Sequence, residues 1–161
     1  MLLLLIRHAQ AVERNPAALP DDTLRELTPK GKKIHEQMSR ALRKHDLVPN
    51  AILASPWKRA WQTALILAKG AGGDVVACPE LAASPDLKGL GEAVGPRSAD
   101  EIVAMVGHEP WLGELASELL AGEPKRLAID FPKSGVLGLD LPEIGAGRAA
   151  LRFFLRPKLI E

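Results

Sequence analysis

The stretch LLLLIRHA, residues 2–9, decides the fold of this chain. Five residues of the buried type end abruptly in Arg7 and His8. An unbroken apolar run of this length is typical of a parallel strand that is covered on both faces. Because ligands bind at the carboxyl ends of strands in open α/β sheets, Arg7 and His8 are predicted to face a ligand.

Length and composition limit the classes of protein that this sequence can encode. The 161 residues are 47% hydrophobic, which is enough for one core and too little for two α/β domains, so residues 1–161 are predicted to form a single domain. A net charge of +1 gives no global field for nucleic acid or an anionic membrane. The apolar start is too short for a signal peptide, no stretch approaches the roughly 20 apolar residues of a membrane span, and the single Cys78 fits a reducing cytosol. We expect a cytoplasmic protein with no nucleic-acid or membrane partner.

Strand-like runs alternate with helical patterns along the chain. The predicted strands are residues 2–6, 51–54, 74–77, 102–106, 136–141 and 149–155, and the predicted helices are residues 29–44, 56–69 and about 110–121. This alternation predicts the α/β class, with three α/β/α layers and a mostly parallel central sheet. A turn rich in Gly and Pro at residues 142–147 predicts that the two C-terminal strands pair antiparallel.

Local signals predict where the helices begin and end. Thr28 supplies a capping hydroxyl before Pro29, and the dipeptide at Ser55 and Pro56 repeats this arrangement after the second strand. Gly70 is placed to end the second helix.

Two segments need a choice from spacing alone. In the first helix the predicted buried positions are Ile34, Met38, Ala41 and Leu42, whereas His35 and His45 are predicted to face solvent. Ser98 and Glu101 resemble a capping box, but the compact apolar run that comes next favours a strand over residues 102–106.

Polar residues follow three of the predicted strands, where each gives way to a loop or helix. They are Arg7 and His8, then residues 55–59 with Arg59, then residues 107–110 with His108. Helix amino-termini concentrate unpaired N–H groups and the positive end of the helix dipole. Together with two arginines and two histidines, they predict a pocket for phosphate or sulfate.

With these motifs in this order, the chain resembles the histidine phosphatase superfamily, also called the phosphoglycerate mutase-like superfamily. Over nearly its whole length it looks like the short bacterial SixA-type phosphohistidine phosphatases. The residues that carry the resemblance are Leu5 to Ala9, Asp22, Arg25 to Thr28, Gly31, Ser55-Pro56, Arg59-Ala60, Gln62-Thr63, Pro79 to Leu81, Gly107-His108 and Pro110.

The resemblance implies a role for each polar residue of this pocket. His8, neutral near a reference pKa of about 6.5, would attack phosphorus and carry it as a phosphohistidine intermediate to water. A backbone carbonyl near the first loop is expected to orient its other ring nitrogen. Arg7 and Arg59 would grip the phosphoryl oxygens in pairs, His108 would donate to a third oxygen, and Arg25 would add a further contact.

Two departures from the family pattern bear on the substrate. Ala9 replaces the commoner glycine, which a backbone that is not left-handed tolerates. Ala82 and Ala83 stand where many relatives carry a glutamate that protonates the leaving oxygen. General acid catalysis is worth a factor of about 10² to 10⁴, whereas a protonated imidazole leaves as a neutral base. The sequence therefore favours a phosphohistidine-bearing protein, such as a histidine phosphotransfer domain, as substrate.

Alternatives stay open at this level. One is a small-molecule phosphomonoesterase, with Glu80 or Glu109 as a proton relay, and another is a phosphoprotein-binding module without turnover. Trp57 and Trp61 are spaced for helix packing, or could dock a protein substrate together with Trp111. The sequence has no nucleotide-binding loop or metal-ligand motif, so no cofactor and no metal are expected.

Overall fold

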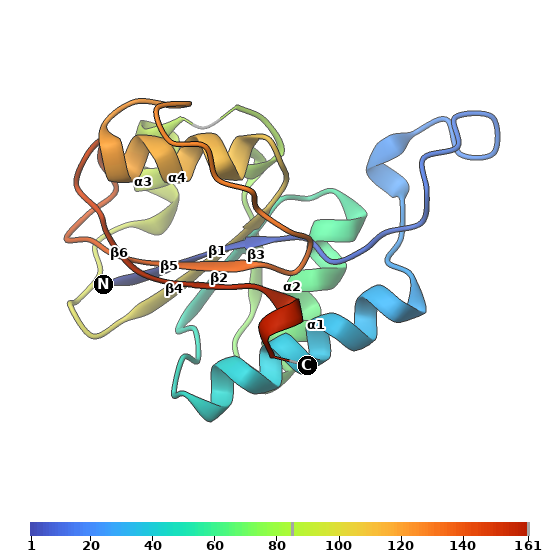
Figure 1. Cartoon of the computed structure of the whole chain (residues 1–161), viewed down its shortest axis with the longest axis horizontal. Coiled ribbons are helices and arrows are strands. Elements are labelled where there is room, and N and C mark those ends of the chain that lie inside the picture. Colours follow the sequence, from blue (N-terminus) through green and yellow to red (C-terminus); the bar gives the residue numbers. More distant parts are fainter. Residues whose placement is uncertain (85, 161) are drawn as a thin grey trace.

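The computed structural model describes residues 1–84 and 86–160, and its strands form one mixed sheet (Figure 1). The elements in chain order are β1 (Leu2–Arg7), η1 (Asp22–Leu24), α1 (Pro29–Lys44), β2 (Ala51–Ala54), α2 (Lys58–Ala71), β3 (Val75–Ala77), η2 (Pro79–Ala82), α3 (Leu87–Val94), β4 (Ile102–Gly107), α4 (Trp111–Ala121), β5 (Val136–Asp140), β6 (Ala150–Leu155) and η3 (Pro157–Leu159), where η marks a 3-10 helix. The strand order is β3-β2-β4-β1-β5-β6. The first four strands of this order pair parallel, and β5 pairs antiparallel with both β1 and β6. The predicted α/β class and antiparallel C-terminal pair are confirmed.

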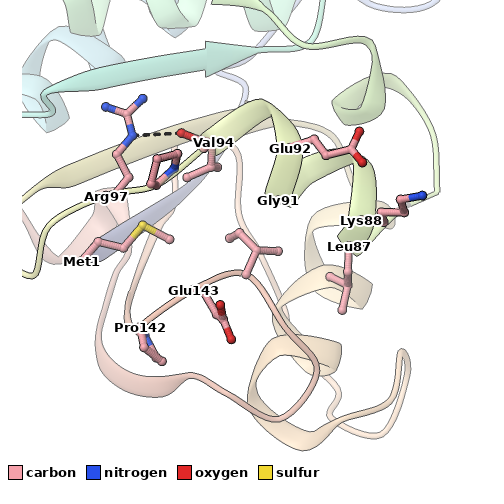
Figure 2. A pocket seen from close by; sticks show the side chains of 12 residues that line it. Met1, Leu87, Lys88, Gly91, Glu92, Val94, Arg97, Pro142 and Glu143 are labelled. Carbon is pink, nitrogen blue, oxygen red and sulfur yellow. Dashed lines mark hydrogen bonds between the residues drawn. The ribbon is translucent and has the colours of Figure 1, made fainter.

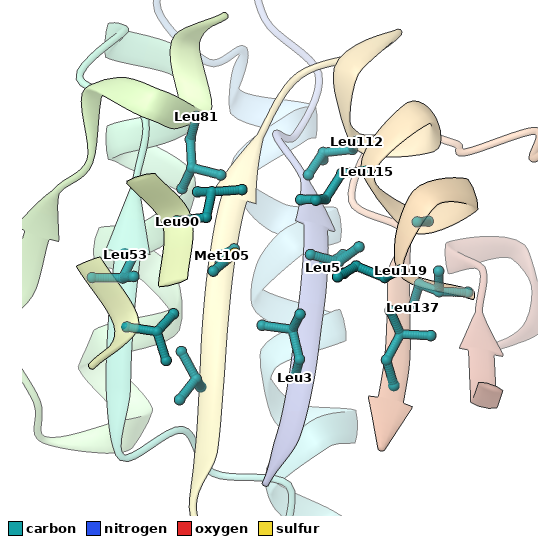
Figure 3. Close-up of a cluster of buried hydrophobic side chains, with 14 of the residues drawn as sticks. Leu3, Leu5, Leu53, Leu81, Leu90, Met105, Leu112, Leu115, Leu119 and Leu137 are labelled. Carbon is teal, nitrogen blue, oxygen red and sulfur yellow. The ribbon is translucent and has the colours of Figure 1, made fainter. Parts of the chain in front are cut away.

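Helices cover both faces of this sheet, so the predicted three layers are also confirmed. In Figure 1, α3 and α4 lie over one face and α1 and α2 over the other. Because side chains alternate along a strand, Leu3 and Leu5 of β1 pack toward α4, as Figure 3 shows, while Leu2, Leu4 and Ile6 pack toward α1 and α2. Burial on both faces explains why β1 is an unbroken apolar run.

The register of the central strands brings the predicted pocket residues to one edge. In the parallel pair of β1 and β4, Arg7 lies opposite Gly107. His8 and His108 are the next residues of the two strands, and the backbone N–H of His8 donates to the carbonyl of Gly107 across 3.0 Å. Two histidines separated by 99 intervening residues therefore leave the sheet side by side.

The start of α1 is as predicted. The Thr28 hydroxyl accepts a hydrogen bond from the Gly31 N–H at 2.9 Å, and Pro29 occupies the first helical position. Met38 and Leu42 are buried as predicted.

The exposure predicted for His35 is wrong. Its side chain is 0% exposed, whereas Ile34 and Ala41 are only partly buried. The buried stripe of α1 is therefore rotated toward the loop that precedes β5, where a hydroxyl contacts the His35 ring. Helical periodicity does not show which polar side chain has a buried partner in a distant loop.

The predicted limits of the second helix are each displaced by two residues. It begins at Lys58 and not at Pro56, and it ends before Gly72, which has a left-handed φ of 70°. Gly70 lies inside the last turn, where a Cβ would meet the guanidinium end of the Arg43 side chain. Gly70 therefore leaves room for the Arg43 side chain from α1 and does not end the helix.

The structure also resolves the less regular middle of the chain. Helix α3 has no counterpart among the predicted helices; it is only eight residues long and is capped by the Asp86 carboxylate. The predicted strand at residues 102–106 is confirmed as β4, while Glu101 accepts from the Ser98 N–H at 2.7 Å with no helix after it. None of the helices in the described ranges is long and apolar enough to cross a membrane.

Candidate active site

A cavity of about 290 Å³ opens at the carboxyl ends of β1 and β4, beside the start of α2. Its walls include all five residues that the sequence predicts for the site, Arg7, His8, Arg25, Arg59 and His108. The structure thus brings together residues from four separate segments of the chain. Their chemical roles stay predictions.

Hydrogen bonding determines which nitrogen of His8 carries the proton. The Nδ1 atom lies 2.7 Å from the carbonyl oxygen of Ala9, which is the expected orienting carbonyl. Because a carbonyl only accepts, the proton sits on Nδ1 and Nε2 keeps a free lone pair. Burial lowers the pKa of His8 to about 3, although the hydrogen bond to Ala9 acts in the opposite direction. The pKa is thus far below the expected value near 6.5, and the ring is neutral at neutral pH.

Arg59 is buried against His8 and held in place on three sides. Its Nε donates to His8 Nε2 at 3.3 Å. One terminal nitrogen donates to the carbonyl of Asp22 at 2.9 Å and the other to its carboxylate at 3.2 Å. The guanidinium carbon also lies 4.8 Å from the centre of the Trp57 ring. Each terminal nitrogen predicted to grip phosphate therefore has one of its two N–H groups bound to Asp22.

Asp22 connects the arginines around the cavity. Its carboxylate accepts from Arg25 Nε at 2.7 Å as well as from Arg59, and it lies 3.9 Å from Arg14. Burial raises the pKa of Asp22, but the hydrogen bond from Arg25 and the neighbouring positive charges outweigh it and lower the pKa below its ordinary value. Asp22 belongs to the motifs of the sequence, yet nothing in the sequence shows that it would bind Arg59.

His108 packs between polar and aromatic groups. Its Nε2 lies 2.8 Å from the Ser55 hydroxyl, and its ring centre lies 4.6 Å from that of Trp57 and 5.2 Å from that of His8. Burial lowers the pKa of His108 to about 3, and the charge of Arg59 acts in the same direction. His108 is therefore neutral in the free protein, and any hydrogen bond that it donates comes from a neutral ring.

Arg7 and Lys133 add further positive charge to the walls of the cavity. A terminal nitrogen of Arg7 donates to the carbonyl of Phe131 at 2.7 Å. Lys133, two residues further along, also lines the cavity. Sequence reasoning missed Lys133, because it lies in the irregular segment between α4 and β5 and in none of the motifs.

One of the two predicted proton relays lies on the cavity wall. Glu109 lines it, and burial raises the pKa of Glu109, partly offset by a hydrogen bond from the Gly113 N–H at 2.7 Å. Glu80 instead lies 3.2 Å from the thiol of Cys78, which donates to it. Burial raises the pKa of that thiol to about 12, so Cys78 is a poor nucleophile.

The tryptophans divide between the cavity and the core. Trp57 and Trp111 both line the cavity, with ring centres 6.1 Å apart in an edge-to-face arrangement. Trp61 packs against the hydrophobic core beneath α1 and α2. The helical pair Trp57 and Trp61 therefore does not form one surface.

A larger cavity, of about 620 Å³, lies at the opposite edge of the sheet (Figure 2). Its walls include Met1, Glu143 and Arg97, whose Nε donates to the carbonyl of Val94 at 3.0 Å. Met1 precedes the six residues of β1 and His8 comes directly after them, so at about 3.3 Å per residue the two cavities lie about 20 Å apart. The cavity with the larger volume is therefore not the one that contains the predicted site residues.

The fold and the site define an α/β protein whose cavity gathers cations around a neutral histidine at the carboxyl edge of the sheet. Residues 3–85, slightly more than half of the chain, match the histidine phosphatase superfamily (branch 1). The chain belongs to this superfamily, whose members are phosphatases. A search of curated protein sequences found no match.

Solved structures share the fold over nearly the whole chain. The protein histidine phosphatase SixA, complexed with tungstate, matches with a TM-score of 0.83 and 22% identity over 100% of both chains. A protein of Agrobacterium tumefaciens assigned as the phosphohistidine phosphatase SixA matches with a TM-score of 0.75 and 25% identity over 97% of each chain. A mycobacterial glucosyl-3-phosphoglycerate phosphatase matches with a TM-score of 0.68 and 17% identity over 94% of this chain and 96% of its own.

Proposed function

We propose that this protein is a phosphohistidine phosphatase that removes the phosphoryl group from a histidine of a phosphoprotein, such as a histidine phosphotransfer domain. The observation that carries the proposal is the unprotonated Nε2 of His8 in a cavity lined by Arg7, Arg25 and Arg59. The similarity to two SixA structures supports the same substrate class. Tungstate in one of them supports a phosphate-like anion as the ligand of the cavity.

The first chemical step transfers the phosphoryl group to His8. The Nε2 lone pair forms a bond to phosphorus while the bond from phosphorus to the substrate imidazole breaks, and that electron pair returns to the substrate nitrogen. Protonated on its other nitrogen, the substrate ring leaves as neutral imidazole. The low pKa of His8 keeps its lone pair available without a general base.

The second step returns His8 to its starting state. Water attacks phosphorus, the bond from phosphorus to Nε2 breaks, and inorganic phosphate leaves with the oxygen of that water. The Ala9 carbonyl holds the proton on Nδ1 through both steps, so the same nitrogen is regenerated as nucleophile.

Arg59 responds to the bond that forms beside it. In the free protein its Nε–H donates to the lone pair of His8 Nε2. When that lone pair bonds to phosphorus, the N–H loses its acceptor and is free to donate to a phosphoryl oxygen. Asp22 keeps the guanidinium in place, while Arg7, Arg25 and His108 contribute further charge and donors.

The leaving group decides between two kinds of phosphatase. Ala82 and Ala83 carry no carboxylate, in agreement with a substrate that needs no acid from that segment. Glu109 favours a second candidate, a small-molecule phosphomonoesterase, because it lines the cavity and its pKa is raised toward that of a proton donor.

A comparison of substrates tests the two candidates. Wild-type protein and Glu109→Gln are assayed with a histidine-phosphorylated protein, a phosphoserine peptide and a sugar phosphate under identical conditions. The proposal expects turnover of phosphohistidine only, with little change in Glu109→Gln. Comparable turnover of the sugar phosphate, lost in Glu109→Gln, would establish the phosphomonoesterase.

A trapping experiment tests the nucleophile and the third reading, a binding module without turnover. Labelled phosphate from the substrate should be recovered on His8 after a rapid quench without acid, and His8→Ala should retain phosphate binding but lose turnover. Binding without any turnover by the wild type would establish the binding module.

A further inference from the structure

A third cavity, of about 450 Å³, lies beside the candidate active site. Lys133 lies on the walls of both this cavity and the active-site cavity. Ser134, the next residue, lines the third cavity, and its backbone N–H donates to the carbonyls of Arg7 and His8 at 3.1 and 3.3 Å. A ligand in the third cavity would therefore be separated from the proposed nucleophile by a single loop.

The charged residues found on the walls of this third cavity all have the same sign. Among residues 1–84 and 86–160, four cationic residues and no carboxylate line it, namely Lys30, Lys133, Arg156 and Lys158, and we call it the basic cavity. Arg156 pairs with the exposed carboxylate of Asp130 at 2.8 Å. Within residues 1–84 and 86–160, the three lysines form no ion pair. Since the net charge of the chain is only +1, this is a local concentration of positive charge.

The helix beside the basic cavity has three lysines close to its amino-terminus, the end where positive charge is unfavourable. Lys30, Lys32 and Lys33 lie near the amino-terminus of α1, and the first turn has no acidic residue. The positive end of a helix dipole stabilises anions and repels cations. Glu36 lies within one turn of Lys32 and Lys33 but not of Lys30, the lysine of the three that lines the basic cavity. An anionic group in the basic cavity would relieve the repulsion at Lys30.

The remaining walls are partly apolar. Ile34, Pro132 and Pro157 line the basic cavity and are each partly exposed. A free inorganic ion gains nothing from such walls, whereas a protein surface can bury apolar groups between its charged ones. Apolar walls with lysines around them therefore fit a protein partner better than a small anion.

We propose that the basic cavity docks the acidic surface beside the phosphohistidine of the substrate protein, with Lys30, Lys133 and Lys158 facing its carboxylates. The inference rests on the proposed function and extends it from the phosphoryl group to the protein that carries it. Lys133 would contact both ends of the substrate, the phosphoryl group in one cavity and the acidic surface in the other.

A charge-reversal variant tests the docking surface. Lys30→Glu/Lys158→Glu is compared with Lys44→Glu/Lys88→Glu, a control of two exposed lysines that line neither the active-site cavity nor the basic cavity. The substrates are an acidic histidine-phosphorylated protein and free phosphoimidazole. We expect kcat/KM for the protein to fall about tenfold or more through KM, with a weaker dependence on salt, and to change less than about twofold for phosphoimidazole.

Two outcomes would overturn the docking proposal. The first is an equal loss of kcat/KM for both substrates, which would mean that the lysines support the active site itself. The second is an unchanged kcat/KM for the protein substrate. If the charge-reversal variant fails to fold, as judged by circular dichroism, Lys30→Gln/Lys158→Gln replaces it with the same expectation.

A binding measurement separates this proposal from the proposed function. If the wild type hydrolyses neither substrate, the proposed function fails, and the affinity of the His8→Ala protein for the phosphoprotein then decides the docking. Adding the two lysine substitutions to His8→Ala should weaken that affinity at least about tenfold, and unchanged affinity would refute the docking surface. Poly-glutamate should inhibit hydrolysis of the protein substrate and leave that of phosphoimidazole unaffected.

Discussion

Arg59 donates from its Nε to the Nε2 of His8 across 3.3 Å, so the proposed nucleophile and its neighbouring cation are bound to each other before any substrate arrives. Because the Arg59 N–H donates, the Nε2 of His8 must be unprotonated for this hydrogen bond to form. His8 must be protonated on Nδ1, which the Ala9 carbonyl ensures, and Arg59 must be oriented by Asp22. The site is therefore organised by the hydrogen bonds of the folded chain.

Replacing Arg59 with lysine should lower kcat/KM by about 10²-fold. An ammonium is a compact donor that cannot contact His8 and both acceptors of Asp22 at once, and loss of one such donor costs about this factor. Steady-state kinetics measures the effect, with the exposed Arg40→Lys as the matched control. Wild-type rates in Arg59→Lys would exclude the fixed guanidinium from the mechanism.

Asp22→Asn should separate binding from turnover. Removing the carboxylate charge raises the positive potential of the cavity, so inhibition by inorganic phosphate should strengthen severalfold. Loss of the ionic contact also loosens Arg59, so kcat should fall by about tenfold. The exposed Asp74→Asn serves as control, and a parallel weakening of phosphate binding and kcat would contradict this assignment.

The rings of His8 and His108 should not titrate near neutral pH. Burial lowers both pKa values to about 3, so their ring ¹⁵N shifts should stay those of neutral imidazole from about pH 8 to about pH 5, with the proton of His8 on Nδ1. In the urea-unfolded chain His8 and His108 should titrate at about 6.5. A shift midpoint near neutrality for His8 in the folded protein would show that its lone pair is not kept free by burial.

His35 should make folding stability depend on pH. Burial lowers its pKa to about 4 from 6.5, so between these two pH values the unfolded chain binds the proton more readily than the folded one. Its contribution is fully present above about pH 6.5 and is lost as the pH falls toward about 4. Between about pH 7 and pH 5 the loss is about 2 kcal/mol.

His35→Gln tests this dependence because glutamine can still contact the Ser134 hydroxyl but does not titrate. The free energy of unfolding in urea should fall less between pH 7 and pH 5 in this variant than in the wild type. His8 and His108 act in the same direction in both proteins, so the difference isolates His35. Equal losses in the two proteins would mean that the His35 ring is not kept neutral by burial.

The sequence predicts the layers, the strands and the residues of the site because these depend on local order. An apolar run such as residues 2–6 forms a strand wherever both of its faces are covered, and the cap at Thr28 acts within four residues. Parallel strands bring their carboxyl ends to one edge, so His8 and His108 meet there once the strand order is right. Local pattern and this one geometric rule were therefore enough to predict that these residues lie together at one edge of the sheet.

The rest was decided by contacts between distant segments. Asp22 binds Arg59, which lies 37 positions further along the chain, and His35 contacts Ser134, which lies 99 positions further along. The periodicity of the sequence predicts neither contact. Burial in the folded chain, and not residue type, lowers the pKa of His8 to about 3. The sequence by itself thus determined which groups reach this edge of the sheet, whereas only the tertiary structure decided their protonation, their partners and the basic cavity beside them, because desolvation and charge depend on distances in space.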